Sequence, residues 1–301
     1  MNNKVAEIIT NRFLEGIKSS GSLPWTKPWK TVAFRNAVSG RQYNGINVLM
    51  LALFGRDTDY LTFNQAKDNK GMVRKGSKGL PIVYYQALDK KDKVTGDVIR
   101  NSRGQAEQWR MLRYSTVFNL SDIEGCDALK AKAAARNKLI TFSPIETCEA
   151  LVKNYGITIK YDSNQASYSP AIHAIQMPDK ERFVSVEKFY CTLFHEIGHS
   201  LAKEQGEDIA NGFGSDPYAR EELVAELFAN FCLSYAGIDS STLFDHSLAY
   251  VQSWTSKLTS DPTILISAAS RASKRLYWLL GNAGLLVQEE TPEVELEASV
   301  A

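Results

Sequence analysis

The five residues His195-Glu196-Ile197-Gly198-His199 place two histidines four positions apart, with a glutamate beside the first. On an α-helix, positions i and i+4 lie above one another on one face, so both imidazoles can reach a single metal ion. Glu196 then points toward the water that such an ion holds. The pentapeptide therefore predicts a helix that supplies His195 and His199 as metal ligands and Glu196 as the catalytic base.

The residues around the pentapeptide support a helix. Apolar side chains recur at helical spacing from Val186 to Leu201, and Ser185 is placed to cap the first turn. Cys191 lies one turn before the first histidine, and we expect it to be a small buried side chain rather than a ligand. Gly198 suits a close approach by another segment, at a cost to helix propensity of about 1 kcal/mol.

A catalytic metal site usually has three protein ligands, so a third ligand should follow downstream. Residues 216–231 are predicted to form a second helix, with Pro217 in its first turn and Gly237 beyond its end. Glu222 and Glu226 share one face of this helix, where two carboxylates repel each other unless a cation or a donor lies beside them. We assign Glu222 as the third ligand and Glu226 as the residue that orients a histidine. Alternatively, Glu226 is the ligand and Glu222 is a solvated acid near the helix N-terminus.

These groups predict a zinc-dependent peptidase, with manganese or another divalent metal as the alternative cofactor. A bound ion would polarise the scissile carbonyl and lower the pKa of water to about 7, while Glu196 would pass the proton to the leaving amine. Tyr168, His173 and Tyr218 are weak candidates for stabilising the oxyanion, because each has a structural role as its simpler explanation. A metal-binding but inactive site is the alternative to a peptidase.

Composition excludes a membrane protein. The chain has 301 residues, of which 44% are hydrophobic and 23% are charged, as in soluble globular proteins. Its longest apolar run, residues 46–54, is too short to span a bilayer, and the polar N-terminus lacks a signal-peptide core. Four cysteines without CxxC pairing suit a reducing compartment. We therefore expect a cytoplasmic protein with no membrane partner.

Charge divides the chain into unlike halves. Residues 1–125 carry 20 basic and 11 acidic side chains, whereas residues 126–301 carry 15 and 23. A basic half beside an acidic half suggests that the first half binds a polyanion. The predicted parts are a basic domain at 1–125, a linker at 126–143, a metallopeptidase domain at 144–288 and an acidic flexible tail at 289–301.

Aromatic and basic residues interleave in the basic domain. This pattern is typical of single-stranded nucleic-acid surfaces, where rings stack on bases and cations follow phosphates. A basic loop with two glycines at 73–79 adds backbone amides for phosphate, without the Walker spacing. The alternative is that the tryptophans are core residues. The residues predicted to contact DNA are Trp25, Lys27, Trp29, Arg41, Tyr43, Arg74, Lys75, Lys78, Arg113 and Tyr114.

The expected fold class is α+β. Residues 79–88 and 109–120 have strand composition and are joined by a polar loop, which predicts a curved antiparallel sheet with helices in the first domain. In the second domain, residues 168–178 are predicted to form an edge strand that would receive an extended substrate by main-chain pairing.

Several strings resemble a known family. The spacing of Glu222 and Glu226 is similar to that of the Glu-zincin metallopeptidases. Across nearly its full length the chain resembles ArdC antirestriction proteins, whose N-terminal domain also occurs in conjugative plasmid primases. The matching strings are Leu23-Pro24-Trp25, Tyr43-Asn44-Gly45-Ile46-Asn47, Tyr60-Leu61-Thr62-Phe63-Asn64-Gln65-Ala66, Arg74-Lys75-Gly76, Val117-Phe118-Asn119-Leu120, the 195–199 motif and residues 218–226.

The resemblance implies a plasmid-encoded protein that binds single-stranded DNA through its first domain and carries a zincin-like metallopeptidase domain. Such a protein protects incoming DNA from restriction in a recipient cell. Its substrate would be an unidentified protein, and binding to DNA would raise its effective concentration near proteins on the same strand. The alternative is a non-enzymatic protein that coats single-stranded DNA. His173 departs from the family, in which an acidic residue is common at this position.

Overall fold

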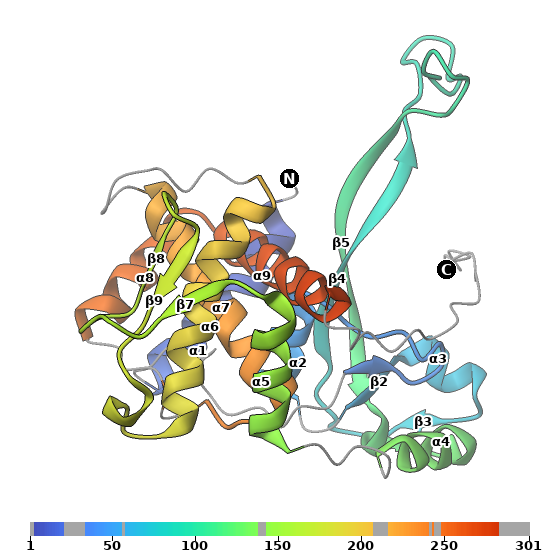
Figure 1. The fold of residues 1–301 in the computed structure, drawn as a ribbon. Helices are drawn as coiled ribbons and strands as arrows, with labels where there is room; N and C mark the ends of the chain where they lie inside the picture. The colour runs from blue at the N-terminus through green and yellow to red at the C-terminus, as the bar shows by residue number, and fades with distance from the viewer. Residues whose placement is uncertain are drawn as a thin grey trace.

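In the computed structural model the described residues form helices and three small sheets (Figure 1), which confirms the α+β class. None of the described helices combines the length and apolarity needed to cross a bilayer. Trp25, Lys27, Trp29 and the predicted tail at 289–301 lie outside the described residues. The structure describes residues 3–20, 34–55, 58–137, 143–206, 216–240, 243 and 248–282.

A four-stranded sheet in the order β1-β2-β5-β4 forms the N-terminal half. β4 (Leu80–Asp89) and β5 (Gln108–Asn119) pair antiparallel, and their bounds agree with the two predicted strands to within one residue. β2 (Asp59–Thr62) pairs antiparallel with β5 and parallel with the short β1 (Arg35–Asn36). The antiparallel sheet predicted from sequence therefore carries one parallel pair at its edge.

Helix α2 (Ile46–Phe54) is tied to this sheet by a buried amide. The Asn47 side chain donates to the carbonyl oxygen of Val83 and accepts from its amide nitrogen, both at 2.7 Å. A polar side chain can be buried here because the strand completes its hydrogen bonds. The other elements of this half are α3 (Phe63–Asp68), β3 (Met72–Val73), the 3₁₀ helix η2 (Leu120–Asp122) and β6 (Ile123–Glu124), which pairs with β3.

The predicted linker at 126–143 contains a helix, α4 (Asp127–Asn137). Its Ala133 is buried in a small cluster with Ala37 and Leu61 of the N-terminal half. The helix is therefore packed against the sheet domain instead of running free between the two halves.

The C-terminal half is built around two neighbouring helices, α6 (Val186–Glu204) and α7 (Asp216–Ala236). α5 (Pro144–Tyr155) and α9 (Thr263–Asn282) pack on them (Figure 1). The Ser185 hydroxyl accepts a hydrogen bond from the Lys188 amide at 3.1 Å, which confirms the predicted cap of α6. Both helices that carry the predicted site therefore form where the sequence placed them.

A three-stranded sheet lies beside α6, in the order β7 (Thr158–Lys160), β9 (Ala174–Gln176), β8 (Ser167–Ser169). The prediction of one edge strand over 168–178 is wrong, because these residues form the antiparallel pair β8 and β9. Pro170 lacks an amide hydrogen and ends the first strand, and His173 closes the turn with a φ of 46°. A 3₁₀ helix, η3 (Lys180–Arg182), follows this sheet.

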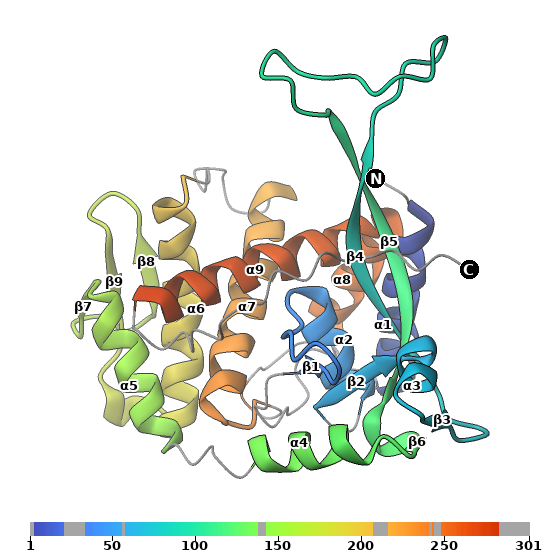
Figure 2. The ribbon, with the colours of Figure 1, turned by 90° about the vertical axis from the view of Figure 1, so that its right-hand side faces the viewer.

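Helix α1 (Asn3–Ser20) completes the core of the C-terminal half, although it begins the basic half of the sequence (Figure 2). It contacts α8 (Leu248–Ser260) and α9, and the Thr10 hydroxyl donates to the carbonyl oxygen of Pro262 at 2.7 Å. Ile9 and Phe13, with no exposed surface, belong to the same core cluster as residues of α6, α7 and α9. The two halves thus share one hydrophobic core.

Beyond this core, β4 and β5 continue as a two-stranded arm that stands out from the body (Figures 1 and 2). We define the arm as residues 84–113. Leu112 at its base is the one buried side chain among those that the structure describes in this range. The arm is therefore held by strand pairing, not by packing against the body.

Candidate metal centre

The site forms where α6 and α7 lie in close contact at Gly198. A Cβ atom at this position would lie 3.0 Å from Cα of Ala225 and 3.1 Å from Cδ1 of Phe228. Any side chain here would push the helices apart, which is the reason for the glycine that the sequence pattern indicated. The absence of a side chain brings the histidine-bearing face of α6 against α7.

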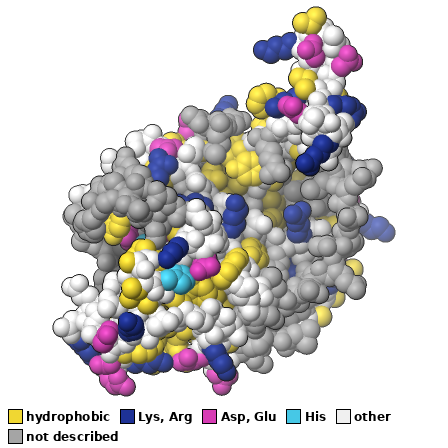
Figure 3. All heavy atoms as spheres, turned by 45° about the horizontal axis from the view of Figure 1, so that its top comes forward, with side chains coloured by type: hydrophobic (Ala, Val, Ile, Leu, Met, Phe, Trp, Pro, Cys, Tyr) yellow, Lys and Arg dark blue, Asp and Glu magenta, His cyan; other side chains and the backbone are white. Residues whose placement is uncertain are grey.

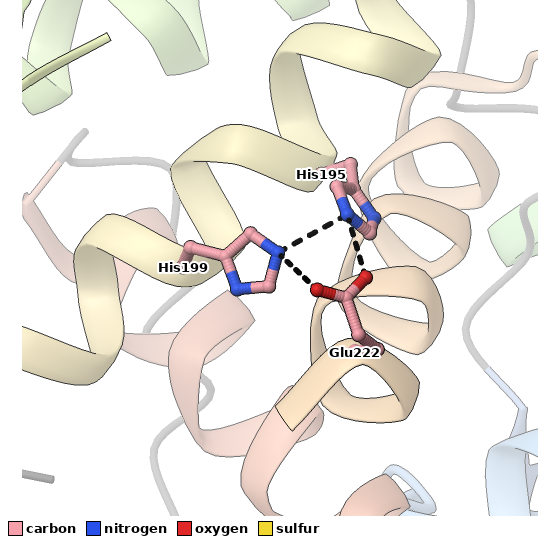
Figure 4. A group of neighbouring side chains, drawn as sticks. All are labelled: His195, His199 and Glu222. Atoms are coloured by element: carbon pink, nitrogen blue, oxygen red, sulfur yellow. Dashed lines mark hydrogen bonds and ion pairs between the residues drawn. The ribbon is translucent and has the colours of Figure 1, made fainter. Parts of the chain in front are cut away.

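Three side chains converge at this contact (Figure 4). The Nε2 atoms of His195 and His199 are 3.1 Å apart. The Glu222 carboxylate oxygens lie 3.4 Å from Nε2 of His195 and 3.5 Å from Nε2 of His199. In a tetrahedral zinc site with bonds of about 2.0–2.1 Å, donor atoms are about 3.3 Å apart. The three residues therefore fit one divalent cation, and their two nitrogens and one oxygen are the donor types that zinc and manganese accept.

The electrostatics of the site favour positive charge. Burial of Glu222 opposes its ionisation, but a hydrogen bond from His195 and the charges of both histidines lower its pKa to about 2. Burial likewise opposes protonation of His195, yet the hydrogen bond to Glu222 and the charges of Glu196, Glu222 and Glu226 raise its pKa. An excess of carboxylates around two imidazoles is the charge balance that a bound cation requires.

Tyr218 borders the same site from the first turn of α7. Its hydroxyl forms a hydrogen bond with Glu222. Burial raises the pKa of Tyr218, and the hydrogen bond with Glu222 and the charges of Glu222 and Glu196 raise it further. Glu196 itself is buried, and its charge acts on both Tyr218 and His195. Of the three oxyanion candidates, Tyr218 is the one in contact with the donor group.

Tyr168 and His173 form a separate group at the turn between β8 and β9. The Tyr168 hydroxyl lies 2.9 Å from Nδ1 of His173, and Nε2 of His173 lies 3.0 Å from a carboxylate oxygen of Glu204. Glu204 is the last residue of α6, so this group ties the turn to the end of the helix. Its contacts account for Tyr168 and His173 as structural residues.

Sequence reasoning missed Glu221, the neighbour of the proposed ligand. Its carboxylate lies 3.6 Å from Nδ1 of His199, on the side of the ring away from the donor cluster. The fully buried Arg275 binds both Glu221 oxygens, at 2.6 and 3.0 Å, and also donates to the carbonyl oxygen of Gly198 at 2.9 Å. Arg271 donates to the same carboxylate at 2.8 Å. Three helices are thus joined behind His199.

This network keeps Glu221 charged. Burial opposes ionisation of Glu221, but His199, Arg275 and Arg271 hold its pKa below the usual range. The sequence had assigned the orienting role to Glu226, which is buried and acts on His195 through its charge. A signal for Glu221 did exist, because two arginines recur four positions apart in the otherwise largely apolar stretch 263–282.

The residues predicted to contact DNA are not in one place. Arg74, Lys75 and Lys78 are exposed in the loop before β4, at the end of that strand opposite to the arm. Arg113 and Tyr114 are exposed at the base of the arm. Arg41 is exposed as well, whereas Tyr43 is half-buried and packs against a core cluster, where burial raises its pKa to about 12.

Two known protein families match separate parts of the chain. Residues 3–118 match the N-terminal domain of anti-restriction factor ArdC, and residues 146–271 match a zincin-like metallopeptidase family. A protein from Escherichia coli named DNA primase TraC is 32% identical over an alignment of 310 residues, gaps included, and the alignment covers 97% of this chain. The chain spans 28% of the length of that relative.

Two solved structures share the whole arrangement. The metal-free crystal structure of the antirestriction protein ArdC from plasmid R388 is 30% identical, with a TM-score of 0.74 over 93% of this chain and 97% of that one. The Mn(II)-bound structure of ArdC from the same plasmid is 29% identical, with a TM-score of 0.70 over 93% of this chain and 98% of that one.

Proposed function

This chain belongs to the ArdC antirestriction family, and from that premise we propose that it binds single-stranded DNA and cleaves proteins with a zinc-dependent peptidase site. The DNA contacts are proposed on exposed cations of the N-terminal half, with Arg74, Lys75 and Lys78 as one group. The peptidase site is proposed at His195, His199 and Glu222, with Glu196 as the base. The protein would act in the cytoplasm of a cell that receives plasmid DNA.

The observation that carries the peptidase proposal is the convergence of three donor atoms on one point. The separations of 3.1, 3.4 and 3.5 Å match those of ligands around a small divalent ion. The match to a zincin-like metallopeptidase family supports the same function, and the Mn(II)-bound relative supports a divalent metal. We propose zinc as the resident ion and manganese as a functional substitute.

The chain's own residues divide the chemistry among them. When bound, the cation supplies Lewis acidity toward a peptide carbonyl and toward water. His195, His199 and Glu222 hold it, while Glu196 accepts a proton from the attacking water and delivers it to the leaving nitrogen. Tyr218 donates its hydroxyl hydrogen to Glu222 and so restrains the orientation of that carboxylate.

Glu221 and Arg275 are proposed to hold His199 in position. A carboxylate near the ring nitrogen that does not bind the metal fixes the tautomer and the orientation of the imidazole. Glu221 occupies this place at 3.6 Å, and the buried Arg275 prevents the carboxylate from turning away.

The proposed substrates are proteins bound to the same DNA strand as this chain. Attachment to DNA converts their encounter with the peptidase into a local event at high effective concentration. The proposed consequence is protection of incoming DNA from restriction.

The test compares wild type with Glu196→Gln, both loaded with zinc or with manganese. Each is incubated with oligonucleotides that carry single-strand-binding proteins, and cleavage is followed by mass spectrometry. We expect cleavage by the wild type alone, with equal DNA affinity for both proteins. If neither protein cleaves, the peptidase proposal is wrong. If Glu196→Gln protects transferred DNA in cells as well as wild type does, protection arises from coating of the strand and not from proteolysis.

A further inference from the structure

The two faces of the arm differ in composition. Side chains alternate along a strand, and residues directly opposite each other in an antiparallel pair share a face. Tyr84 pairs with Arg113, and Leu88 pairs with Trp109. These four residues therefore lie on one face of the arm, which we call the cationic aromatic face.

This face presents two exposed rings and two cations. Tyr84 is 47% exposed and Trp109 is 63% exposed. The Lys90 ammonium lies 4.8 Å from the centre of the Trp109 ring, and Arg113 is exposed beside Tyr84, with its Nε donating to Gln86 at 3.2 Å. Each of these rings thus lies beside a cation on the arm (Figure 3 shows the arm rising from the body).

The opposite face is different, although it also carries tyrosines. Its pairs include Val83 with Tyr114 and Tyr85 with Leu112, and both aliphatic residues are buried in the core. Tyr85 is 56% exposed. Asp89 pairs with Gln108 on this face and accepts a hydrogen bond from its side chain at 2.9 Å.

The charge of the arm suits a polyanion. Residues 84–113 contain seven Lys and Arg residues and four Asp and Glu residues. Asp92 is engaged by the backbone of its own turn at the tip, accepting from two amide nitrogens at 2.8 and 2.9 Å, and Glu107 is paired with Lys90 at 2.9 Å. The guanidinium of Arg113 is exposed and has a neutral partner, Gln86, so its charge is available to a phosphate of an incoming strand.

We propose that the cationic aromatic face of the arm binds single-stranded DNA, with Tyr84 and Trp109 stacking on bases while Arg113 contacts a phosphate. This proposal rests on the proposed binding of single-stranded DNA and locates a second contact, remote in the fold from the loop at 74–78. It also assigns to Arg113, and not to Tyr114, the contact with the strand at the base of the arm.

Exposed rings favour unpaired bases over a duplex. A two-stranded ribbon can enter the major groove, but there it reads base edges with hydrogen-bonding side chains. Tyrosine and tryptophan offer flat faces instead, and every unpaired base has a flat face that can stack on them without sequence preference.

The experiment measures anisotropy of a fluorescent oligo(dT) strand titrated with the full chain. Tyr84→Ala and Trp109→Ala are each compared with Tyr85→Ala, which removes an equally exposed ring from the opposite face. Stacking of one base on a ring predicts that each of the first two variants raises the Kd about 5- to 150-fold. Tyr85→Ala should leave the Kd within twofold of wild type, and Arg113→Gln should reduce the salt slope by about 0.7.

The outcomes separate the two levels of the proposal. If wild type does not bind the strand, the proposed DNA-binding function fails together with this inference. If wild type binds and both Tyr84→Ala and Trp109→Ala bind equally well, DNA binding stands and the arm is not its site. Equal loss in Tyr85→Ala would overturn the assignment to one face. Thermal unfolding of each variant checks that the exposed substitutions leave the fold intact.

Discussion

The metal centre and the arm are opposite solutions to placing polar side chains. At the candidate metal centre the proposed ligands come from two adjoining helices, and the fully buried Arg275 of a third helix joins them from behind. On the arm, side chains protrude from two paired strands, and Leu112 is the one buried side chain among the described residues there. The first arrangement holds a few atoms at set distances, as catalysis demands. The second would offer repeated weak contacts to the flexible strand that we propose it binds.

The difference has a consequence for mutation. A single change at the candidate metal centre should abolish the proposed peptidase activity, because each residue there is proposed to have one role in one geometry. Removal of a single cation from the arm or from the basic loop at 73–79 should weaken DNA binding only in part, because the contributions of charges along a strand add up.

The largest effect is expected from Glu196→Gln, which preserves the shape of the side chain and removes its capacity to accept a proton. Peptidase activity should fall about 10²- to 10⁴-fold, the usual contribution of a general base. Activity is measured on a protein substrate of the zinc-loaded enzyme. Glu187→Gln in the first turn of the same helix is the control and should retain activity.

The next largest effect is expected from Glu221→Gln, which should weaken the binding of zinc. The neutral amide cannot balance the charge of Arg275 or orient the His199 ring as the carboxylate does. Affinity for zinc should therefore fall about 10- to 100-fold. Competition with a chromogenic chelator measures this affinity without reference to activity. Arg220→Gln is the matched control, since it removes an exposed charge from the adjacent position of α7. Equal zinc affinity in wild type and Glu221→Gln would mean that Glu221 does not position the ligand.

Gly198→Ala should destabilise the fold through the contact between α6 and α7. The new methyl group would meet Ala225 at 3.0–3.2 Å and Phe228 at 3.1 Å. Overpacking of this kind costs about 1–3 kcal/mol, and alanine recovers about 1 kcal/mol in helix propensity. Urea unfolding of the metal-free protein should therefore show lower or, at best, unchanged stability. A clear gain in stability would show that the two helices separate readily.

The smallest effect per residue is expected on the basic loop. Lys75→Ala with Lys78→Ala should weaken binding of single-stranded DNA and reduce the slope of log K against log salt by about 1.4, because each lysine is expected to neutralise one phosphate of a single strand. Lys153→Ala with Lys160→Ala, exposed on the C-terminal half, is the control pair. A slope equal to that of wild type would remove the loop from the DNA surface.

Local signals in the sequence predicted the helices of the site. The cap at Ser185, the apolar spacing of α6 and the end of α7 before Gly237 depend on residues close in the chain. The same spacing put His195 and His199 on one face, where the structure has them.

These local signals could not predict contacts between residues that are far apart in the chain. Arg275 and Glu221 are 54 positions apart, and the spacing of Arg271 and Arg275 signals that α9 needs an acidic partner without showing which carboxylate it will meet. The turn at His173 was missed because its left-handed backbone is stabilised by Tyr168 and Glu204, which come from two elements. The alternation of side chains between the two faces of β4 and β5 could be predicted from the sequence. The sequence did not show that these strands would extend beyond the body and leave both faces uncovered.

The packing of α1 against the last helices sets an order of events during translation. Thr10 and its partner Pro262 are 252 positions apart, so the first helix leaves the ribosome long before α8 and α9 exist. At roughly 5–20 residues per second, about 12–50 s of synthesis separates them. During this interval Ile9 and Phe13 lack their final partners on α9. Nascent chains arrested before Pro262 should therefore expose α1 to protease or chaperone, and full-length chains should not.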